Sequence, residues 1–282
     1  MNLEISVAEH YTAGSLLEAI LNGIKRAGKT VDSIQLDDLA PLDEFHIGGR
    51  EATRHFLGQM EFRPDMQVLD IGCGLGGATR FSASQYGCQV TGIDLTQDFI
   101  ETGKTLTSWL KMDDRVSLKQ ASALQMPYQD STFEAAYMMH VGMNISDKDQ
   151  LFREASRVLK KGSSFGIYDV MLTGEKPLSY PVPWAENTNS CFIAKPEVYL
   201  QALRDAGFEI MNTTSRKDFA LDFFQKLNQK ISSSEGPPPL GLHLVMKESL
   251  ADKIKNLLKT SNPTGLHLLK SLQNMQNDMD NG

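Results

Sequence analysis

Cysteine is scarce in this sequence, with three residues in 282. Cys73, Cys88 and Cys191 form an odd set without the close spacing of a metal motif, which predicts free thiols in a reducing compartment and no metal site. Any run of 18 apolar residues is also missing, and the first residues lack the basic-then-apolar order of a signal peptide. We therefore expect a cytoplasmic protein without a membrane span.

Positive charge is in short supply as well. Lys and Arg number 28 against 35 Asp and Glu, which gives a net charge of -7, and the basic residues are scattered. A surface without a basic face does not neutralise a phosphate backbone, so no nucleic-acid partner is expected. A length of 282 residues suffices for one large core with appendages.

Glycine, by contrast, is concentrated at one informative place. Residues 67–77 read Gln-Val-Leu-Asp-Ile-Gly-Cys-Gly-Leu-Gly-Gly, an apolar strand that runs into an acid and then into a glycine turn before a helix. This layout builds a nucleotide-type pocket at the carboxyl end of a strand. Gly72, Gly74 and Gly77 also satisfy the dinucleotide fingerprint, so the glycines alone leave the ligand open.

Two acids flank the turn and favour one ligand. Asp70 would repel a pyrophosphate but attract an ammonium group, which the amino-acid part of S-adenosylmethionine (SAM) offers. Asp94 ends the next predicted strand, where a carboxylate accepts hydrogen bonds from ribose hydroxyls. The alternatives are that Asp70 only satisfies amides of the turn and that Asp94 caps the next helix, although Thr96 and Asp98 are better placed as caps.

The rest of the chain alternates short apolar runs with helical stretches, which predicts parallel strands joined by crossover helices. We expect a Rossmann-like α/β fold with a seven-stranded, mostly parallel, doubly wound sheet, an N-terminal helical lid at 1–50, a core at 51–213 with a lid insertion at 173–194, and a C-terminal helical extension at 214–282. Strands are predicted at 68–71, 89–93, 116–120, 133–139, 164–170 and 208–213, and helices at 15–27, 50–60, 78–86, 98–110, 148–159 and 196–206.

The motif at 68–74, together with Gly92-Ile93-Asp94, resembles that of class I SAM-dependent methyltransferases over about residues 40 to 212. The resemblance is to the small-molecule branch, similar to ubiquinone-type and sarcosine/dimethylglycine methyltransferases. Residues 45–53 also look like the lead-in of phosphoethanolamine methyltransferases. That likeness implies that Phe45 and His46 touch the cofactor and that Tyr11 closes over the amine acceptor.

The resemblance also implies a set of residues that bind SAM, with one departure. Where the family has an acid for the adenine amino group, this chain has Ser122, whose hydroxyl accepts a hydrogen bond more weakly, with the amide of Ala123 sharing the task. The antiparallel seventh strand of the family has only the apolar run 242–246 available. The expected cofactor contacts are Phe45, His46, Asp70, Gly72, Cys73, Gly74, Asp94, Leu95, Ser122, Ala123 and Met139.

The fourth predicted strand ends in Met-Met-His-Val-Gly-Met-Asn at 138–144, at the edge that faces the methyl group in this fold. His140 stands where phosphoethanolamine enzymes have an acid, and their catalytic histidine falls near Asn144, which argues against phosphoethanolamine as substrate. A histidine followed by Met-Asn-Ile looks like amino-acid N-methylating enzymes. His140 is a candidate proton acceptor, and the alternative is a hydrogen bond to the cofactor or a carbonyl.

Several other side chains carry two interpretations each. His46 precedes two glycines at a helix start, and the alternative is a turn histidine at the surface. Trp184 and Tyr180 line either an aromatic cage for a cation or a packed lid. For Arg50 and Arg54 a solvated helix face is favoured over contact with a substrate carboxylate.

These features predict an enzyme that transfers a methyl group from SAM to a small molecule, with an amine nitrogen as the favoured acceptor and Tyr11 and His140 beside it. The alternative within the class is an O- or C-methyltransferase acting on an apolar natural product or a quinone precursor. From other classes, an NAD-dependent dehydrogenase and a SAM-binding protein without catalysis stay open. The C-terminal extension is the segment expected to pack on a second subunit in a homodimer.

Overall fold

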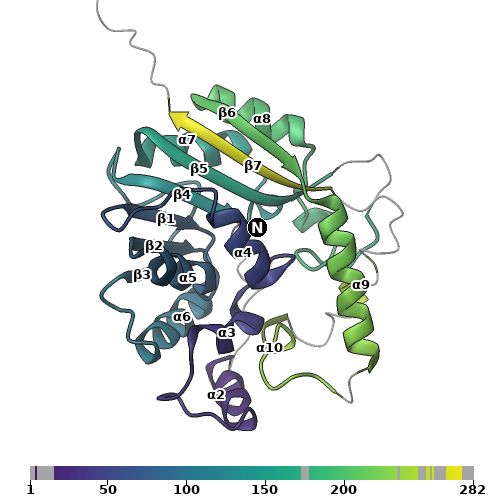
Figure 1. Cartoon of the computed structure of the whole chain (residues 1–282). Helices are drawn as coiled ribbons and strands as arrows, with labels where there is room; N and C mark the ends of the chain where they lie inside the picture. The colour runs from purple at the N-terminus through teal and green to yellow at the C-terminus, as the bar shows by residue number, and fades with distance from the viewer. Residues whose placement is uncertain are drawn as a thin grey trace, which may run out of the picture.

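A seven-stranded sheet in the order β3-β2-β1-β4-β5-β7-β6 runs through the molecule (Figure 1). This computed structural model describes residues 4, 16–172, 178–233, 236–246, 252–254, 256 and 265–274. The first five strands are parallel, whereas β7 is antiparallel to β5 and β6. The Rossmann-like α/β class with its parallel sheet is therefore confirmed. The strands are β1 Gln67–Ile71, β2 Gln89–Asp94, β3 Val116–Gln120, β4 Phe133–Met139, β5 Leu159–Met171, β6 Phe208–Ser215 and β7 Gly265–Asn274.

Helices cover both faces of the sheet because successive strand side chains point to opposite faces. In β4, Tyr137 packs in the core on the side of α4 and α5, whereas Met138 packs with α7 and α8. Strand order reverses between β1 and β4, since the chain returns from the β3 edge to the centre. Ligands of such sheets bind at this reversal. The helices are α4 Gly49–Leu57, α5 Gly77–Tyr86, α6 Gln97–Trp109, α7 Lys148–Val158 and α8 Pro196–Asp205.

The N-terminal part contains the helices predicted at 15–27 and 50–60, but the second packs on a face of the sheet rather than over its carboxyl edge, with Phe56 against Gly166 of β5. It contains α2 Leu16–Arg26 and α3 Leu36–Asp43, followed by α4. The helix α3 was not predicted, since it is short, contains Pro41 and carries three acids. A buried ion pair fixes it: Asp43 Oδ2 lies 2.6 Å from Nη2 of Arg80 in α5.

The C-terminal part differs from the prediction in two places. The run 242–246, expected as a strand, contains helix α10 His243–Met246 instead. The tail was expected to be helical, yet β7 pairs with β5 from Ser164↔Leu272 to Met171↔Gly265. Short apolar runs do not distinguish helix from strand, and pairing between residues about 100 positions apart decides the outcome.

A long helix, α9 Lys217–Ser233, follows β6 and lies beside the carboxyl ends of the parallel strands (Figure 1). Its apolar residues recur with helical spacing, and Phe219 packs against the turn before α4. Each helix among the described residues is too short or too polar to cross a bilayer.

Candidate functional site

A cavity of about 1010 Å³ opens at the carboxyl ends of β1, β2 and β4, between the sheet and the segments α3, α4 and α9. It contains nearly all of the predicted site residues. Tyr11 lies outside the described residues, and Ser122 is next to the lining rather than in it. The predicted residues that line the cavity are Phe45, His46, Asp70, Gly72, Cys73, Gly74, Asp94, Leu95, Ala123, Met139 and His140.

The glycine turn forms the floor of one end. Gly72 has a φ of +74°, and a Cβ there would lie 2.3 Å from a methyl of Val141, so no larger residue fits. A Cβ on Gly74 would meet only the ring of Phe45, at 3.3 Å. The amides of Gly72 and Cys73 both donate to the carbonyl of Ile93, at 2.8 and 2.9 Å. The turn is thus fixed against the end of β2.

Asp94 fixes the same turn through its side chain. Its Oδ2 accepts a hydrogen bond from the amide of Gly74 at 2.9 Å, and its Oδ1 accepts one from the amide of Thr96 at 2.9 Å. Burial raises the pKa of this carboxyl group above its ordinary value, although the two amides act against the rise. Asp94 also lines the cavity.

Asp70 is buried near the end of β1, and its partners are hydroxyl groups rather than the turn amides of the alternative interpretation. Its Oδ2 accepts hydrogen bonds from the hydroxyls of Thr79 at 2.7 Å and Tyr137 at 3.1 Å. Burial raises the pKa of Asp70 to about 7, against the effect of these hydrogen bonds. Asp70 therefore changes charge near neutral pH while it lines the cavity.

The end of β3 presents small side chains to the cavity. Ala121 and Ala123 line it, while the hydroxyl of Ser122 accepts a hydrogen bond from the amide of Leu124 at 3.0 Å. That hydroxyl also bonds to the carboxylate of Glu4, which lines the cavity. A carboxylate from the N-terminal segment thus stands beside Ser122.

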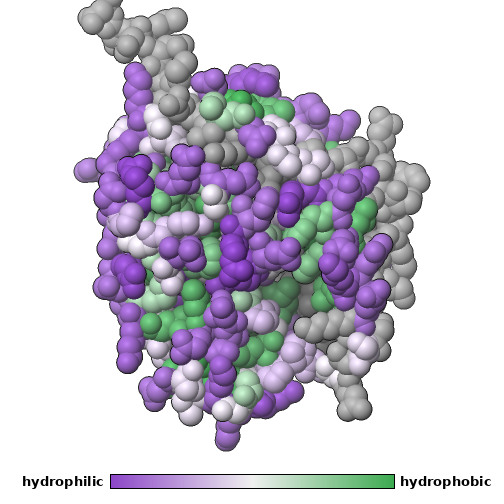
Figure 2. All heavy atoms as spheres, viewed as in Figure 1, coloured by the Kyte–Doolittle hydropathy of each residue, from purple (hydrophilic) through white to green (hydrophobic). Residues whose placement is uncertain are grey.

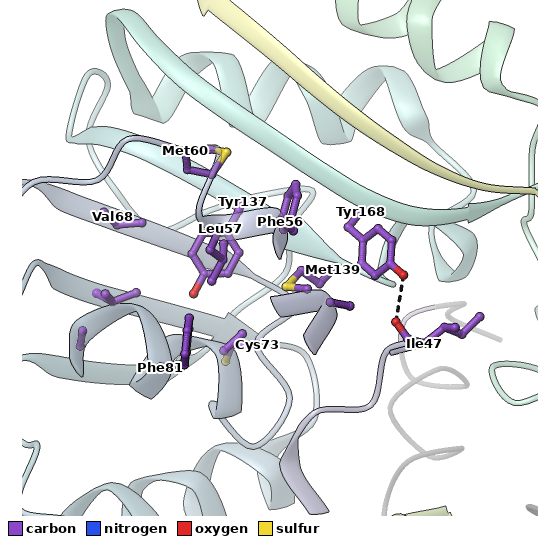
Figure 3. Packing of buried hydrophobic residues seen from close by; sticks show 14 of the residues in the cluster. Ile47, Phe56, Leu57, Met60, Val68, Cys73, Phe81, Tyr137, Met139 and Tyr168 are labelled. Atoms are coloured by element: carbon purple, nitrogen blue, oxygen red, sulfur yellow. Dashed lines mark hydrogen bonds between the residues drawn. The ribbon is translucent and has the colours of Figure 1, made fainter. Parts of the chain in front are cut away.

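His140 lines the cavity directly after β4, the strand next to β1. Its φ is +57°, which is uncommon for a residue with a side chain, and its amide donates to the carbonyl of Tyr168 at 2.8 Å. The ring centres of His140 and Tyr168 are 5.2 Å apart, and Tyr168 donates a hydrogen bond to the carbonyl of Ile47 at 2.9 Å (Figure 3). The Nε2 atom of His140 is buried and has no hydrogen-bond partner among the described residues.

The environment keeps His46 and His140 uncharged at neutral pH. Burial, with a smaller effect of neighbouring His46, lowers the pKa of His140 well below 6.5. Burial also lowers the pKa of His46 to about 4. His46 is 7% exposed, so the interpretation as a surface turn residue is wrong.

A buried polar network surrounds His46, and two of its members, Glu44 and Thr53, were not predicted as site residues. Thr53 donates to Glu44 Oε2 at 2.7 Å and lies 2.8 Å from Nε2 of His46. Burial raises the pKa of Glu44 to about 7. Glu44 directly precedes the predicted Phe45-His46 pair, yet no pattern in the sequence shows that it is buried.

Arg50 completes this network, and the favoured solvated-face interpretation is wrong for it. Its guanidinium forms an ion pair with Glu44, lies 3.1 Å from Asp37 and stacks 4.8 Å from the ring centre of Phe81. Arg54, one turn later, is exposed as expected.

The outer wall comes from α9 and from the irregular segment after β5. Trp184 is 4% exposed, lines the cavity and donates through Nε1 to the sulfur of Cys191 at 3.2 Å. Tyr180 packs against the core but does not line the cavity, so the two rings do not form a shared cage. The side chains contributed by α9 are Phe223, Phe224 and Leu227. They were not predicted as site residues, although their helical spacing indicates an apolar helix face.

Comparison with known proteins identifies the domain. Residues 69–167 match the family described as methyltransferase domain. Sarcosine/dimethylglycine N-methyltransferase of Halorhodospira halochloris is 32% identical over 146 residues, which cover 52% of this chain and 52% of that protein. Sterol 24-C-methyltransferase of Yarrowia lipolytica is 30% identical over 175 residues, 57% of this chain and 45% of that protein. This chain thus spans about half the length of the curated relatives it matches.

A solved structure agrees on the fold. Phosphoethanolamine N-methyltransferase 2 of Haemonchus contortus, in complex with SAM, superposes with a TM-score of 0.71 at 19% identity, covering 90% of this chain and 59% of that one. The sequence-based prediction of a methyltransferase domain is confirmed by the family match.

Proposed function

We propose that this chain, whose residues 69–167 carry a methyltransferase domain, transfers a methyl group from SAM to a small-molecule acceptor. One observation carries the proposal. The carboxyl groups of Asp70 and Asp94 line the same cavity as His140, whose Nε2 atom has no partner among the described residues. Asp70 and Asp94 can bind a cationic ligand with ribose hydroxyls, and His140 can accept a hydrogen bond from the N–H or O–H group of an acceptor.

The residues at the glycine turn fit SAM. The turn needs glycine at 72, and Gly72 and Gly74 both line the cavity without a side chain, as a closely approaching ligand requires. In its ionised form, Asp70 attracts the ammonium group. Asp94 accepts hydrogen bonds from the ribose hydroxyls while it holds the amide of Gly74. When bound, SAM supplies an activated methyl group on a sulfonium sulfur.

We assign the adenine to the small side chains at the ends of β2 and β3. Leu95 and Ala123 offer apolar contact, and the hydroxyl of Ser122 lies beside the carboxylate of Glu4, which can accept a hydrogen bond from the adenine amino group. The remaining proposed cofactor contacts are Phe45, His46, Cys73 and Met139.

We assign the proton transfer to His140. Its ring is uncharged at neutral pH and can take the proton that an attacking N–H or O–H group loses. Its left-handed backbone supports this role, because strained residues concentrate at active sites. By resemblance, we also place Tyr11 over the acceptor, with 1–50 acting as lid to the core 51–213 and the segment 173–194 and extension 214–282 around it.

Calorimetric titration with SAM and with NAD tests the proposal. We expect saturable binding of SAM and no binding of NAD, since Asp70 repels a pyrophosphate. Binding of NAD alone would favour a dehydrogenase and refute the proposal. Incubation with labelled SAM and a panel of amines and phenols then separates N- from O-methylation, and acceptors left unchanged after long incubation indicate a SAM-binding protein without catalysis.

A further inference from the structure

The cavity has a wall of apolar side chains. Four separate segments supply it: the turn after β4, the segment that contains Trp184, α9, and the chain after α9. In Figure 2 hydrophobic side chains gather along the side of α9 that faces α3 and α4. The apolar residues of this wall are Met143, Ile145, Pro183, Trp184, Phe223, Phe224, Leu227, Pro237, Pro238, Leu242, Val245 and Ile254.

Packing fixes α9 in this position. A Cβ on Gly48 would lie 2.5 Å from the ring of Phe219, so the helix rests directly on the turn before α4. Phe223 and Phe224 follow one turn later, and Phe224 belongs to the same core as Trp184. The wall is therefore a built surface that closes over the cavity and not a loosely attached helix.

The one guanidinium of the described lining lies beside two carboxylates. Arg50 is the one Lys or Arg among the described lining residues, and its guanidinium is paired with Glu44 and Asp37. His46 and His140 are uncharged at neutral pH, and burial and Arg26 lower the pKa of His243. The described lining thus offers no unpaired cation to a carboxylate or phosphate of an acceptor.

None of the residues that form this wall carries a negative charge. The lining carboxylates belong to the N-terminal segment and to the ends of β1 and β2, and they are Glu4, Asp37, Asp43, Glu44, Asp70 and Asp94. A charged group moved from water to an apolar wall without a partner loses its hydration without compensation. An apolar body of an acceptor gains from the same transfer.

We infer that the acceptor is an uncharged, mostly apolar small molecule that presents one N–H or O–H group to His140, rather than a zwitterionic amino acid. The volume of about 1010 Å³ agrees, since it lies at the upper end of the range of about 300 to 1,000 Å³ for a single ligand and leaves room for cofactor and acceptor together. The inference rests on the proposed methyl transfer.

The reaction balances with the groups at hand. The lone pair of the acceptor atom forms the bond to the methyl carbon while the bond from that carbon to sulfur breaks, and its electron pair stays on sulfur. The acceptor proton passes to Nε2 of His140. His140 then releases this proton to water when the product departs. No oxidant, reductant or further reactant is needed.

Paired acceptors that differ by one carboxylate test the inference. We would measure binding of p-cresol against 4-hydroxybenzoate, and of N-methylaniline against N-phenylglycine, together with sarcosine, from the fluorescence of Trp184 in a Trp109→Phe protein with and without S-adenosylhomocysteine. The uncharged member of each pair should bind at least tenfold more tightly. Equal or tighter binding of the carboxylates or of sarcosine, or no saturable binding of the uncharged members, overturns the inference.

A charge placed in the wall gives a second measurement. Leu227→Lys should weaken binding of the uncharged members at least threefold and strengthen binding of the carboxylates, whereas Leu21→Lys, at a 40% exposed position of α2, should change neither. An unchanged preference in Leu227→Lys contradicts the inference. Failure of the proposed function is distinct, because it shows as absence of SAM binding in calorimetry, whatever the acceptors do.

Discussion

The amide of Gly74 donates a hydrogen bond to Oδ2 of Asp94 at 2.9 Å, so the turn after β1 is held by the acid that ends β2. The same carboxylate holds the amide of Thr96. The Asp94 side chain therefore holds the turn and lines the cavity, so its removal should disturb both the turn and ligand binding.

Asp94→Ala should weaken SAM binding by about thirtyfold, because two amides lose their acceptor and the ribose loses its partner, at about 1–3 kcal/mol for an unsatisfied group. Calorimetric titration measures the change. Asp113→Asn, at an exposed position outside the cavity, is the control and should bind as the wild type does. Wild-type affinity in Asp94→Ala contradicts the assigned role.

SAM affinity should fall as pH decreases from 8 to 6. The raised pKa of Asp70, about 7, means that its carboxylate is lost below that pH while the ligand's ammonium stays charged, so affinity drops by up to tenfold per pH unit. Titrations at four pH values in Asp70→Asn should show weaker binding at pH 8 and a flatter profile. Glu44, whose pKa is also about 7, could produce the same pH dependence, and titrations of Glu44→Gln measure its contribution. If SAM affinity in Asp70→Asn varies with pH as in the wild type, Asp70 is not the titrating group.

His140→Asn should lower kcat by about 10²- to 10⁴-fold and leave SAM affinity within twofold, since general-base catalysis contributes that much. Asparagine tolerates a positive φ, so this variant removes the ring without adding backbone strain. His55→Asn on the exposed side of α4 serves as the control for loss of a histidine. If His140→Asn keeps the wild-type kcat, as the control should, with a substrate identified from the panel of amines and phenols, His140 does not accept the proton.

Gly48→Ala should destabilise the protein by about 2–4 kcal/mol, because the new Cβ meets the ring of Phe219 at 2.5 Å in a residue with a φ of +92°. Gly28→Ala isolates the backbone contribution, since its φ is +72° and nothing lies within 4 Å of the new Cβ; about 1–2 kcal/mol is expected. Thermal and urea unfolding measure both. In a Phe219→Ala background, Gly48→Ala should cost less than in the wild type, because the ring is gone while the Cβ of Ala52, at 2.8 Å, remains. Equal losses in the Gly28 and Gly48 variants would show that α9 does not pack there.

Thr53→Val should destabilise the protein by about 1–3 kcal/mol, because valine keeps the shape but removes the hydroxyl that joins Glu44 to His46. In urea unfolding, the loss of stability should be larger at pH 8, where Glu44 is ionised and most needs its donor, than at pH 6, where it is protonated. Thr105→Val removes an exposed hydroxyl of α6 and should change stability by less than about 0.5 kcal/mol. Equal losses in the two variants would mean that the buried network contributes nothing.

The sequence by itself determined the cofactor end of the site. Asp70, Gly72 and Gly74 lie in one strand-turn unit, and Asp94 follows in the next, so their geometry depends on contiguous residues and on a regular crossover. The positions of the first five strands follow from the same local periodicity, and the structure agrees with them to within a few residues, except for the earlier start of β5.

Only the tertiary structure decided the other end. Two of the features that it decided join segments that lie far apart in the sequence: the packing of Phe219 on Gly48 and the pairing of β7 with β5. For the third, the buried pair of Glu44 and Arg50, the sequence pattern gives no sign of burial. Burial and pairing energies depend on which surfaces meet, and a local pattern of polar and apolar residues does not encode that. The apolar wall that α9 contributes to the cavity therefore could not be predicted from the sequence alone.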